Sequence, residues 1–146
     1  MIVNGVTLWR ASWCGDFPNQ RGVSVVVIDP LTCAIEGDSQ SFDTYASVTA
    51  ARGLRYHLQQ VDEGKVIIAA TGDEPTRNLR NALPALRQLG VDVGDVGYRG
   101  SFVFVAQKGY PEKTIQDKVV DEDESVTAPA NLDVTTRGMH SRDGNG

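Results

Sequence analysis

The stretch RGVSVVVIDP, Arg21 to Pro30, decides the fold of this chain. Its centre, Val23 to Ile28, is a nearly continuous run of β-branched side chains. Such a run is typical of a strand that is buried on both faces of a sheet. The pair Asp29-Pro30 ends the run, because proline cannot donate a ladder hydrogen bond. We therefore predict a central strand over Val23–Ile28.

The flanking sequence predicts further strands and two helices. We expect strands over residues 5–13, around 40–43, and over 66–70 and 101–107. Apolar residues recur at intervals of three and four from Val48 to Val61, which predicts an amphipathic helix with Ser47 as its N-cap. A second apolar stripe runs from Leu79 to Leu89. Because proline breaks a helix interior, we expect an irregular turn and then a short helix with Pro84 in its first turn.

The length of 146 residues fits one domain with a sizeable core. We assign residues 1–136 to this domain. After Gly109 the sequence becomes polar, although a few apolar residues could still pack as an extended arm. Residues 137–146 are small and polar, and we predict that they form a disordered tail.

Composition and charge argue against two classes of partner. The net charge is −5 and no cluster of Lys and Arg stands out along the sequence, which disfavours nucleic acid. No apolar run approaches the roughly 20 residues that span a bilayer, so we expect no membrane insertion. The start, MIVNGVTLWR, lacks a basic region followed by a long apolar stretch, so no signal peptide is visible.

The cysteines and histidines do not form a recognisable metal or catalytic motif. Cys14 and Cys33 belong to no CxxC pair, and His57 and His140 are the only histidines. We expect no metal site and no cofactor. A disulfide between Cys14 and Cys33 is one alternative and two unpaired thiols are the other, because spacing alone does not establish geometry.

One pair of residues points to a binding site. Asp73 follows one predicted strand and Arg99 precedes another, so both side chains reach the same rim if these strands pair antiparallel. An Asp acceptor and an Arg donor can hydrogen-bond vicinal sugar hydroxyls, with the ring of Tyr98 or Phe102 alongside. The alternative is a plain Asp73–Arg99 ion pair that joins two loops. Asp73-Glu74 before Pro75 is also typical of a cap at the start of a helix.

The order of several motifs resembles the interleukin-like EMT inducer (ILEI) domain family, also called PANDER-like. The motifs are RGVSVVVIDP, SFDTYAS, EGKVIIAATGDE and LRQLGVDVGDVGYRGSFVFVAQKG, and together they cover residues 21–109. Each motif alone is weak, but their order is specific. The family occurs in small secreted cytokine-like proteins, in extracellular hyaluronan-related proteins and in the stem domain of protein O-mannose N-acetylglucosaminyltransferase.

The resemblance implies an α+β fold, a β-sandwich-like pair of sheets flanked by short α-helices, with no catalytic apparatus. In the glycosyltransferase stem the domain resembles a lectin module. Its sugar contacts correspond by motif to Asp73 and Arg99 here, and to Gln40 where the family has arginine. Glutamine still bonds hydroxyls but lacks the charged fork. A family tryptophan corresponds to Phe102, which is either a stacking ring or a core residue.

The leading functional interpretation is therefore a non-catalytic, lectin-like domain that binds terminal sugar hydroxyls of the N-acetylglucosamine or galactose type. The predicted ligand contacts are Asp73 and Arg99, with supporting roles for Gln40, Tyr98, Phe102 and Asp43. The expected partners are glycans or glycoproteins, and the expected location is extracellular, secreted or on a phage or particle surface. The alternative is a cytokine-like protein that binds a protein receptor. A homo-oligomer would raise glycan affinity through multivalency.

Overall fold

A computed structural model describes residues 2–3, 6–7, 21–119 and 131–132 of the chain. Its centre is a five-stranded sheet in the order β4-β3-β5-β6-β7. The strands are β3 (Gly22–Ile28), β4 (Gln40–Phe42), β5 (Val66–Gly72), β6 (Ser101–Gln107) and β7 (Ile115–Val119). Every neighbouring pair in this sheet is antiparallel. The predicted strands over 23–28, 40–43, 66–70 and 101–107 are thereby confirmed.

Strand β3 is buried on both faces of the sheet, as its composition predicts. Val23 and Val25 belong to the core cluster beneath the helices. Val26 and Ile28 belong to a second cluster, which also contains Ile68 of β5. A strand in this position needs apolar side chains at odd and even positions alike, because successive residues face opposite sides.

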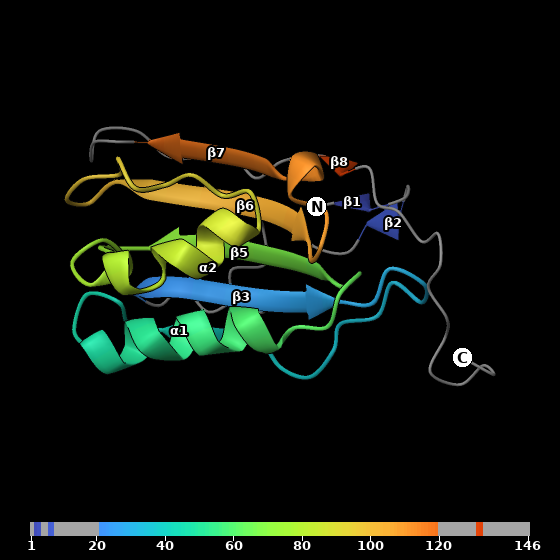
Figure 1. Ribbon diagram of the computed structural model, residues 1–146, viewed down its shortest axis with the longest axis horizontal. Coiled ribbons are helices and arrows are strands. Elements are labelled where there is room, and N and C mark those ends of the chain that lie inside the picture. Colours follow the sequence, from blue (N-terminus) through green and yellow to red (C-terminus); the bar gives the residue numbers. More distant parts are fainter. Residues whose placement is uncertain (1, 4–5, 8–20, 120–130, 133–146) are drawn as a thin grey trace.

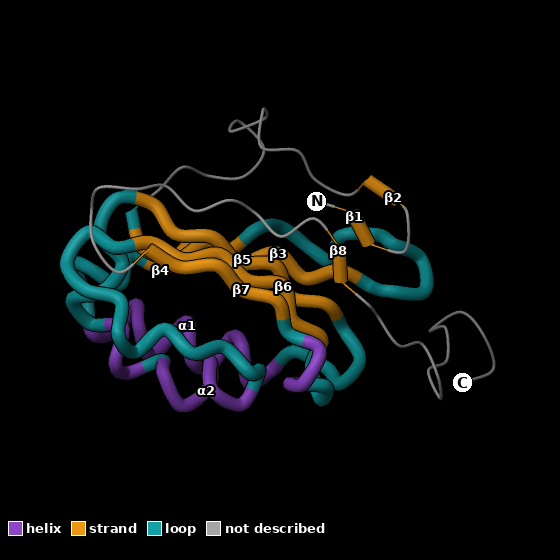
Figure 2. The backbone as a smooth tube through the Cα atoms, turned by 90° about the horizontal axis from the view of Figure 1, so that it is seen from above, coloured by secondary structure: helices purple, strands orange, loops and turns teal. Residues whose placement is uncertain are grey.

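The helices cover one face of the central sheet (Figure 2). Helix α1 (Val48–Gln60) begins at Ser47, whose hydroxyl accepts the backbone N–H of Ala50 at 3.1 Å. A 3₁₀ turn, Leu79–Asn81, leads into helix α2 (Leu83–Gln88), which has Pro84 in its first turn. Helix α1 therefore begins where its N-cap predicts. Helix α2 begins so that Pro84 lies in its first turn, as predicted. In Figure 1, α1 and α2 lie side by side across the strands.

The two layers enclose the main hydrophobic core. Ala51, Leu54 and Leu58 of α1 are buried against the sheet and against α2. Full burial of one such leucine stabilises the fold by about 2 kcal/mol. The core therefore fixes the helical layer firmly against the strands.

A second, small sheet has the order β2-β1-β8. Its strands β1 (Ile2–Val3), β2 (Val6–Thr7) and β8 (Asn131–Leu132) have two residues each. The α+β class is confirmed. The predicted sandwich of two sheets is not shown by the described residues, in which helices, rather than a second sheet, cover one face of the large sheet.

Several predictions lie on residues outside the described ranges. These are most of the strand expected over 5–13, the disordered tail over 137–146 and the disulfide partner Cys14. Cys33 itself is partly exposed. The disulfide and the domain boundary at 136 stay predictions.

A buried ion cluster lies at the end of the sheet where β3 finishes and β5 begins. The Lys65 ammonium lies 3.3 Å from the Asp29 carboxylate and 2.6 Å from that of Glu36. Burial opposes the charge on Lys65, but hydrogen bonds to Glu36 and Asp29 outweigh it, so the pKa of Lys65 is raised. The charges at this end of the sheet are thus largely satisfied within the protein.

Candidate functional site: a charged rim at the opposite end of the sheet

The opposite end of the sheet carries a row of charged residues. β3 begins where β5 ends, with Gly22 opposite Gly72, and β6 begins beside the same end of β5. Arg21 directly precedes β3, Asp73 directly follows β5, and Arg99 lies two residues before β6. Asp43 follows β4, whose Phe42 is opposite Val23. In Figure 1 this is the left-hand end of the sheet, where β3 and β6 begin and β5 ends.

The order of the strands makes the charges alternate along this row, which we call the rim. Read from β4 to β6, the rim runs Asp43, Arg21, Asp73, Arg99. Neighbouring strands are about 4.8 Å apart, so these residues leave the sheet from adjacent positions. Hydrogen-bond acceptors and donors therefore alternate along the rim.

Asp73 and Arg99 share an unusual backbone conformation. Their φ angles are +51° and +57°, and Cys33 is the remaining non-glycine residue with positive φ in the described part of the chain. Side chains other than glycine occupy this left-handed region at a cost of about 1 kcal/mol or more. Both residues are nonetheless exposed at the rim. Backbone strain of this kind gathers at functional sites, which makes the pair the strongest candidate for ligand contact.

Glu74 joins the two loops that carry these residues. Its side chain is buried, and its carboxylate accepts the backbone N–H of Arg99 at 3.1 Å. It also accepts the N–H groups of Thr76 and Arg77 and the hydroxyl of Thr76. Glu74 therefore holds the turn after β5, but it caps no helix: the N-cap of the 3₁₀ turn is Asn78 and that of α2 is Ala82.

The pKa of Glu74 reflects this environment. Burial alone would raise its pKa, but the hydrogen bonds from Thr76, Arg99 and Arg77 together lower it below the ordinary value. The carboxylate stays charged, and a charged acceptor binds backbone donors more strongly than a neutral one. Asp73 and Arg99 form no ion pair with each other in the described structure, so Glu74, not Asp73, joins the loops.

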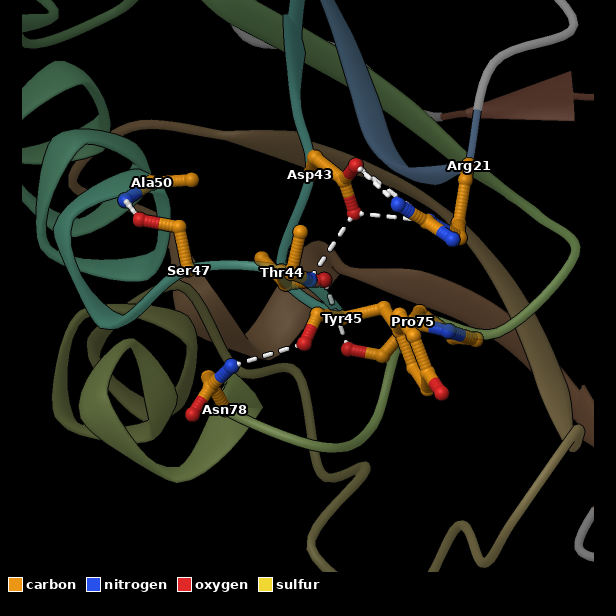
Figure 3. Close-up of polar contacts among 9 residues, drawn as sticks. Arg21, Asp43, Thr44, Tyr45, Ser47, Ala50, Pro75 and Asn78 are labelled. Atoms are coloured by element: carbon orange, nitrogen blue, oxygen red, sulfur yellow. Dashed lines mark hydrogen bonds and ion pairs between the residues drawn. The ribbon is translucent and has the colours of Figure 1, made fainter.

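Arg21 and Asp43 form a bidentate ion pair (Figure 3). Nη2 and Nε of Arg21 donate to the Asp43 carboxylate at 2.8 Å and 3.0 Å. The hydrogen bond to Asp43 raises the pKa of Arg21, and the nearby Asp73 carboxylate contributes in the same direction. Asp43 also accepts the N–H of Ala46 at 3.1 Å. Asp43 thus orders the segment that enters α1, as well as pairing with Arg21.

Tyr45 lies between two guanidinium groups. The Arg21 guanidinium is 4.6 Å from its ring centroid and that of Arg77 is 5.2 Å away. Figure 3 shows the bonds that hold this segment: the Thr44 hydroxyl donates to the carbonyl of Pro75, and Asn78 donates to that of Tyr45. The segment before α1 and the loop after β5 are therefore fixed to each other.

Tyr98 lies beside Arg99 on the exposed side of the rim. It is 65% exposed, and its hydroxyl accepts from Nε of Arg99 at 3.3 Å. The Arg99 guanidinium also lies 5.6 Å from the ring centroid. The tyrosine is thus available as an exposed ring face beside the Arg99 side chain.

Two predicted contacts do not lie at the rim. Phe102 is fully buried beside Phe104 in the core, so of its two interpretations the structure shows the core position. Gln40 is exposed, but it is opposite Val25, further along the strands than Phe42. Its strand is also three strand steps, roughly 14 Å, from the one that follows Arg99. Gln40 therefore does not share one sugar-sized site with Arg99.

Sequence reasoning missed three residues of this region, Arg21, Tyr45 and Arg77. Arg21 is the first residue of the stretch RGVSVVVIDP. Its positions beside Asp43 and Asp73 do not follow from the spacing of these residues in the sequence, because the register of β3 with β4 and with β5 sets both. An arginine immediately before a predicted central strand was the available signal.

Within the described ranges, no group of three or more His, Cys, Asp or Glu side chains could hold a metal ion. No helix in those ranges is long and apolar enough to cross a membrane. His57 is half-buried in α1, where burial lowers its pKa and its ring contacts that of Phe42. It lies away from the rim.

Comparison with known proteins agrees with the order of motifs. The interleukin-like EMT inducer (ILEI) family pattern matches residues 21–110, more than half of the chain. The human cell migration-inducing and hyaluronan-binding protein is 32% identical over 120 residues, which is 81% of this chain and 8% of that protein. Its mouse counterpart is 34% identical over 117 residues, 79% of this chain and again 8% of the relative. The match includes every rim residue, and the chain belongs to the interleukin-like EMT inducer family.

Proposed function

We propose that this chain is a non-catalytic carbohydrate-binding domain whose rim contacts terminal sugar hydroxyls. The observation that carries the proposal is the exposed pair Asp73 and Arg99, held in left-handed backbone conformations on adjacent loops. Asp73 would accept hydrogen bonds from hydroxyls and Arg99 would donate them, with the ring of Tyr98 beside the sugar. The printed name of the two relatives, which describes hyaluronan binding, supports a carbohydrate ligand.

The nearby carboxylates Glu74 and Asp43 have other roles in this proposal. Glu74 positions the backbone of Arg99, and Asp43 is engaged with Arg21, so neither carboxylate is a primary ligand contact in this proposal. Asp73 is exposed, and its carboxylate lies near enough to Arg21 to act on the charge of that side chain. We place N-acetylglucosamine and galactose types first among the sugars to test, and we propose an extracellular setting. A protein receptor and a homo-oligomer stay predictions.

The test is a titration of the chain with N-acetylglucosamine and galactose oligosaccharides, followed by NMR shifts or calorimetry. Asp73→Asn removes the acceptor charge without changing shape, and Arg99→Gly removes the donor while suiting the positive φ. Each should weaken sugar binding at least about tenfold, since a lost charged hydrogen bond costs about 1.5–3 kcal/mol. Gln40→Ala, remote from Arg99, is the control and should bind as the wild type does. Unchanged affinity in both rim variants would remove Asp73 and Arg99 from the site.

A further inference from the structure

The helical layer has a charge opposite to that of the whole chain. The net charge is −5, yet the two stretches that build this layer, residues 44–60 and 76–89, contain no Asp or Glu. The same stretches contain five arginines, Arg52, Arg55, Arg77, Arg80 and Arg87. All five are exposed. The helices lie on one face of the sheet (Figure 2), so folding places these five exposed arginines on the helical layer.

These arginines are not neutralised within the described part of the protein. The ion pairs found there involve Arg21, Lys65 and Lys118, and none involves a helical-layer arginine. Carboxylates flank these stretches on both sides: Asp43 and Glu74 come before them, and Asp62, Glu63, Asp92 and Asp95 come after them. Asp43 is paired with Arg21, and Glu74 accepts backbone N–H groups. Asp95 is paired with Lys118 at 2.7 Å. The five guanidinium groups therefore lack an internal carboxylate partner among these residues.

Helix geometry places the arginines around α2. Gly53 and His57 lie on the side of α1 that contacts Phe42 of β4. At 100° per residue, Arg52 and Arg55 fall on the other side of α1, toward α2. Arg87 is in the last turn of α2, and its guanidinium lies near Gly94 in the following loop. Arg80 is in the 3₁₀ turn that leads into α2, and Arg77 directly precedes that turn.

We propose that this basic helical surface binds an anionic polysaccharide, through carboxylate or sulfate groups spaced along the polymer. Guanidinium groups suit both anions because their paired N–H donors match two oxygens at once. Arg77 contacts the ring of Tyr45, which also contacts the rim residue Arg21. A polymer bound to the helices would therefore continue toward the proposed sugar site. The choice of a glycan among polyanions rests on the function proposed for the rim.

The experiment compares two double variants of equal charge. Arg52→Gln with Arg55→Gln removes two charges from the helical surface. Lys113→Gln with Lys118→Gln removes two from the region around β7 and is the matched control. The probes are hyaluronan oligosaccharides for carboxylate, heparin oligosaccharides for sulfate, a neutral N-acetylglucosamine oligosaccharide, and duplex DNA.

The helical variant should bind the anionic oligosaccharides at least about tenfold more weakly than the wild type, with a shallower salt dependence. The control should stay within about twofold, and circular dichroism should show both folded. The preferred anion then identifies carboxylate or sulfate as the recognised group. Equal losses in both variants, no loss in either, or tighter binding of DNA than of every polysaccharide would overturn the proposal.

The same measurements separate this proposal from that for the rim. Asp73→Asn and Arg99→Gly should abolish binding of the neutral oligosaccharide, which the helical variant should retain. If no neutral sugar binds but the anionic polymers bind through Arg52 and Arg55, the rim proposal fails and the helical surface stands. If the neutral sugar binds through Asp73 and Arg99 but the Arg52 and Arg55 changes do not weaken binding of the anionic polymers, the rim proposal stands and the proposal for the helical surface fails.

Discussion

At the scale of single residues, the adjacent carboxylates Asp73 and Glu74 differ in burial and in hydrogen bonding. Asp73 is exposed, whereas Glu74 is 3% exposed and accepts hydrogen bonds from two loops. Two residues of the same charge, one position apart in sequence, thus differ in exposure and in bonding. The backbone between β5 and the turn has a positive φ at Asp73.

This difference predicts unequal effects on stability for two isosteric substitutions. Glu74→Gln should lower the free energy of unfolding by about 2 kcal/mol, because buried N–H donors lose a charged acceptor. Asp73→Asn, the matched control, should change it by less than about 0.5 kcal/mol, as is usual for exposed positions. Urea denaturation of both variants provides the measurement. Equal stabilities would mean that Glu74 does not join the loops.

The residue scale also marks where sequence reasoning stopped. Asp73, Arg99 and Tyr98 could be selected from the order of motifs, and the antiparallel pairing of β5 and β6 brings their loops together as expected. The sequence allows Phe102 to be a stacking ring or a core residue, because burial of an aromatic at a strand start depends on which face it takes. Gln40 lies away from the rim, because a motif gives order along the chain and no position across the sheet.

At the scale of elements, helix α1 illustrates why the secondary structure was predictable. Its apolar spacing, its N-cap and its position over the sheet all require the same conformation. The short α2 was predictable for a similar reason, since Pro84 permits a helix only when it lies in the first turn. The sandwich of two sheets, which the family resemblance implies, is not shown by the described residues, in which helices cover one face of the large sheet.

The cap of α1 should have a measurable effect on stability. Ser47→Ala removes the acceptor of the Ala50 N–H and should lower the free energy of unfolding by about 1 kcal/mol. Thr49→Ala, an exposed position inside the helix, should leave stability unchanged or slightly raised, because alanine is the better helix former. Thermal and urea unfolding of the two variants would check this. A larger loss for Thr49→Ala would argue against the cap.

At the scale of the whole molecule, the charges are sorted by region in a way that net charge conceals. The alternating rim lies at one end of the sheet and the Lys65 cluster at the other. The helices carry five exposed arginines that form no ion pair with the residues that the structure describes. The sequence showed no basic cluster because these arginines are spread over many positions. Only the packing of α1 beside α2 gathers them on one layer. Composition therefore described the average charge well and its distribution poorly.

The separation of the two ends of the sheet yields a third prediction. Lys65→Met leaves the carboxylates of Asp29 and Glu36 without their cation, and should lower the free energy of unfolding by about 3 kcal/mol. The dissociation constant for a rim sugar should not change, because the rim lies at the far end of the strands. Calorimetric titration and urea denaturation of one variant measure both quantities. A weakened sugar affinity in the folded variant would contradict the independence of the two ends.

The buried carboxylate of Glu74 also sets how far the rim tolerates acid. Its folded pKa lies below the ordinary 4.5, so its contribution to stability is complete above about that pH and is lost only as the pH falls through the lower, folded value. Mild acidification to about pH 5 therefore leaves the loops of Asp73 and Arg99 joined. The positions of the Asp73 and Arg99 backbones should therefore be the same in a weakly acidic setting as at neutral pH.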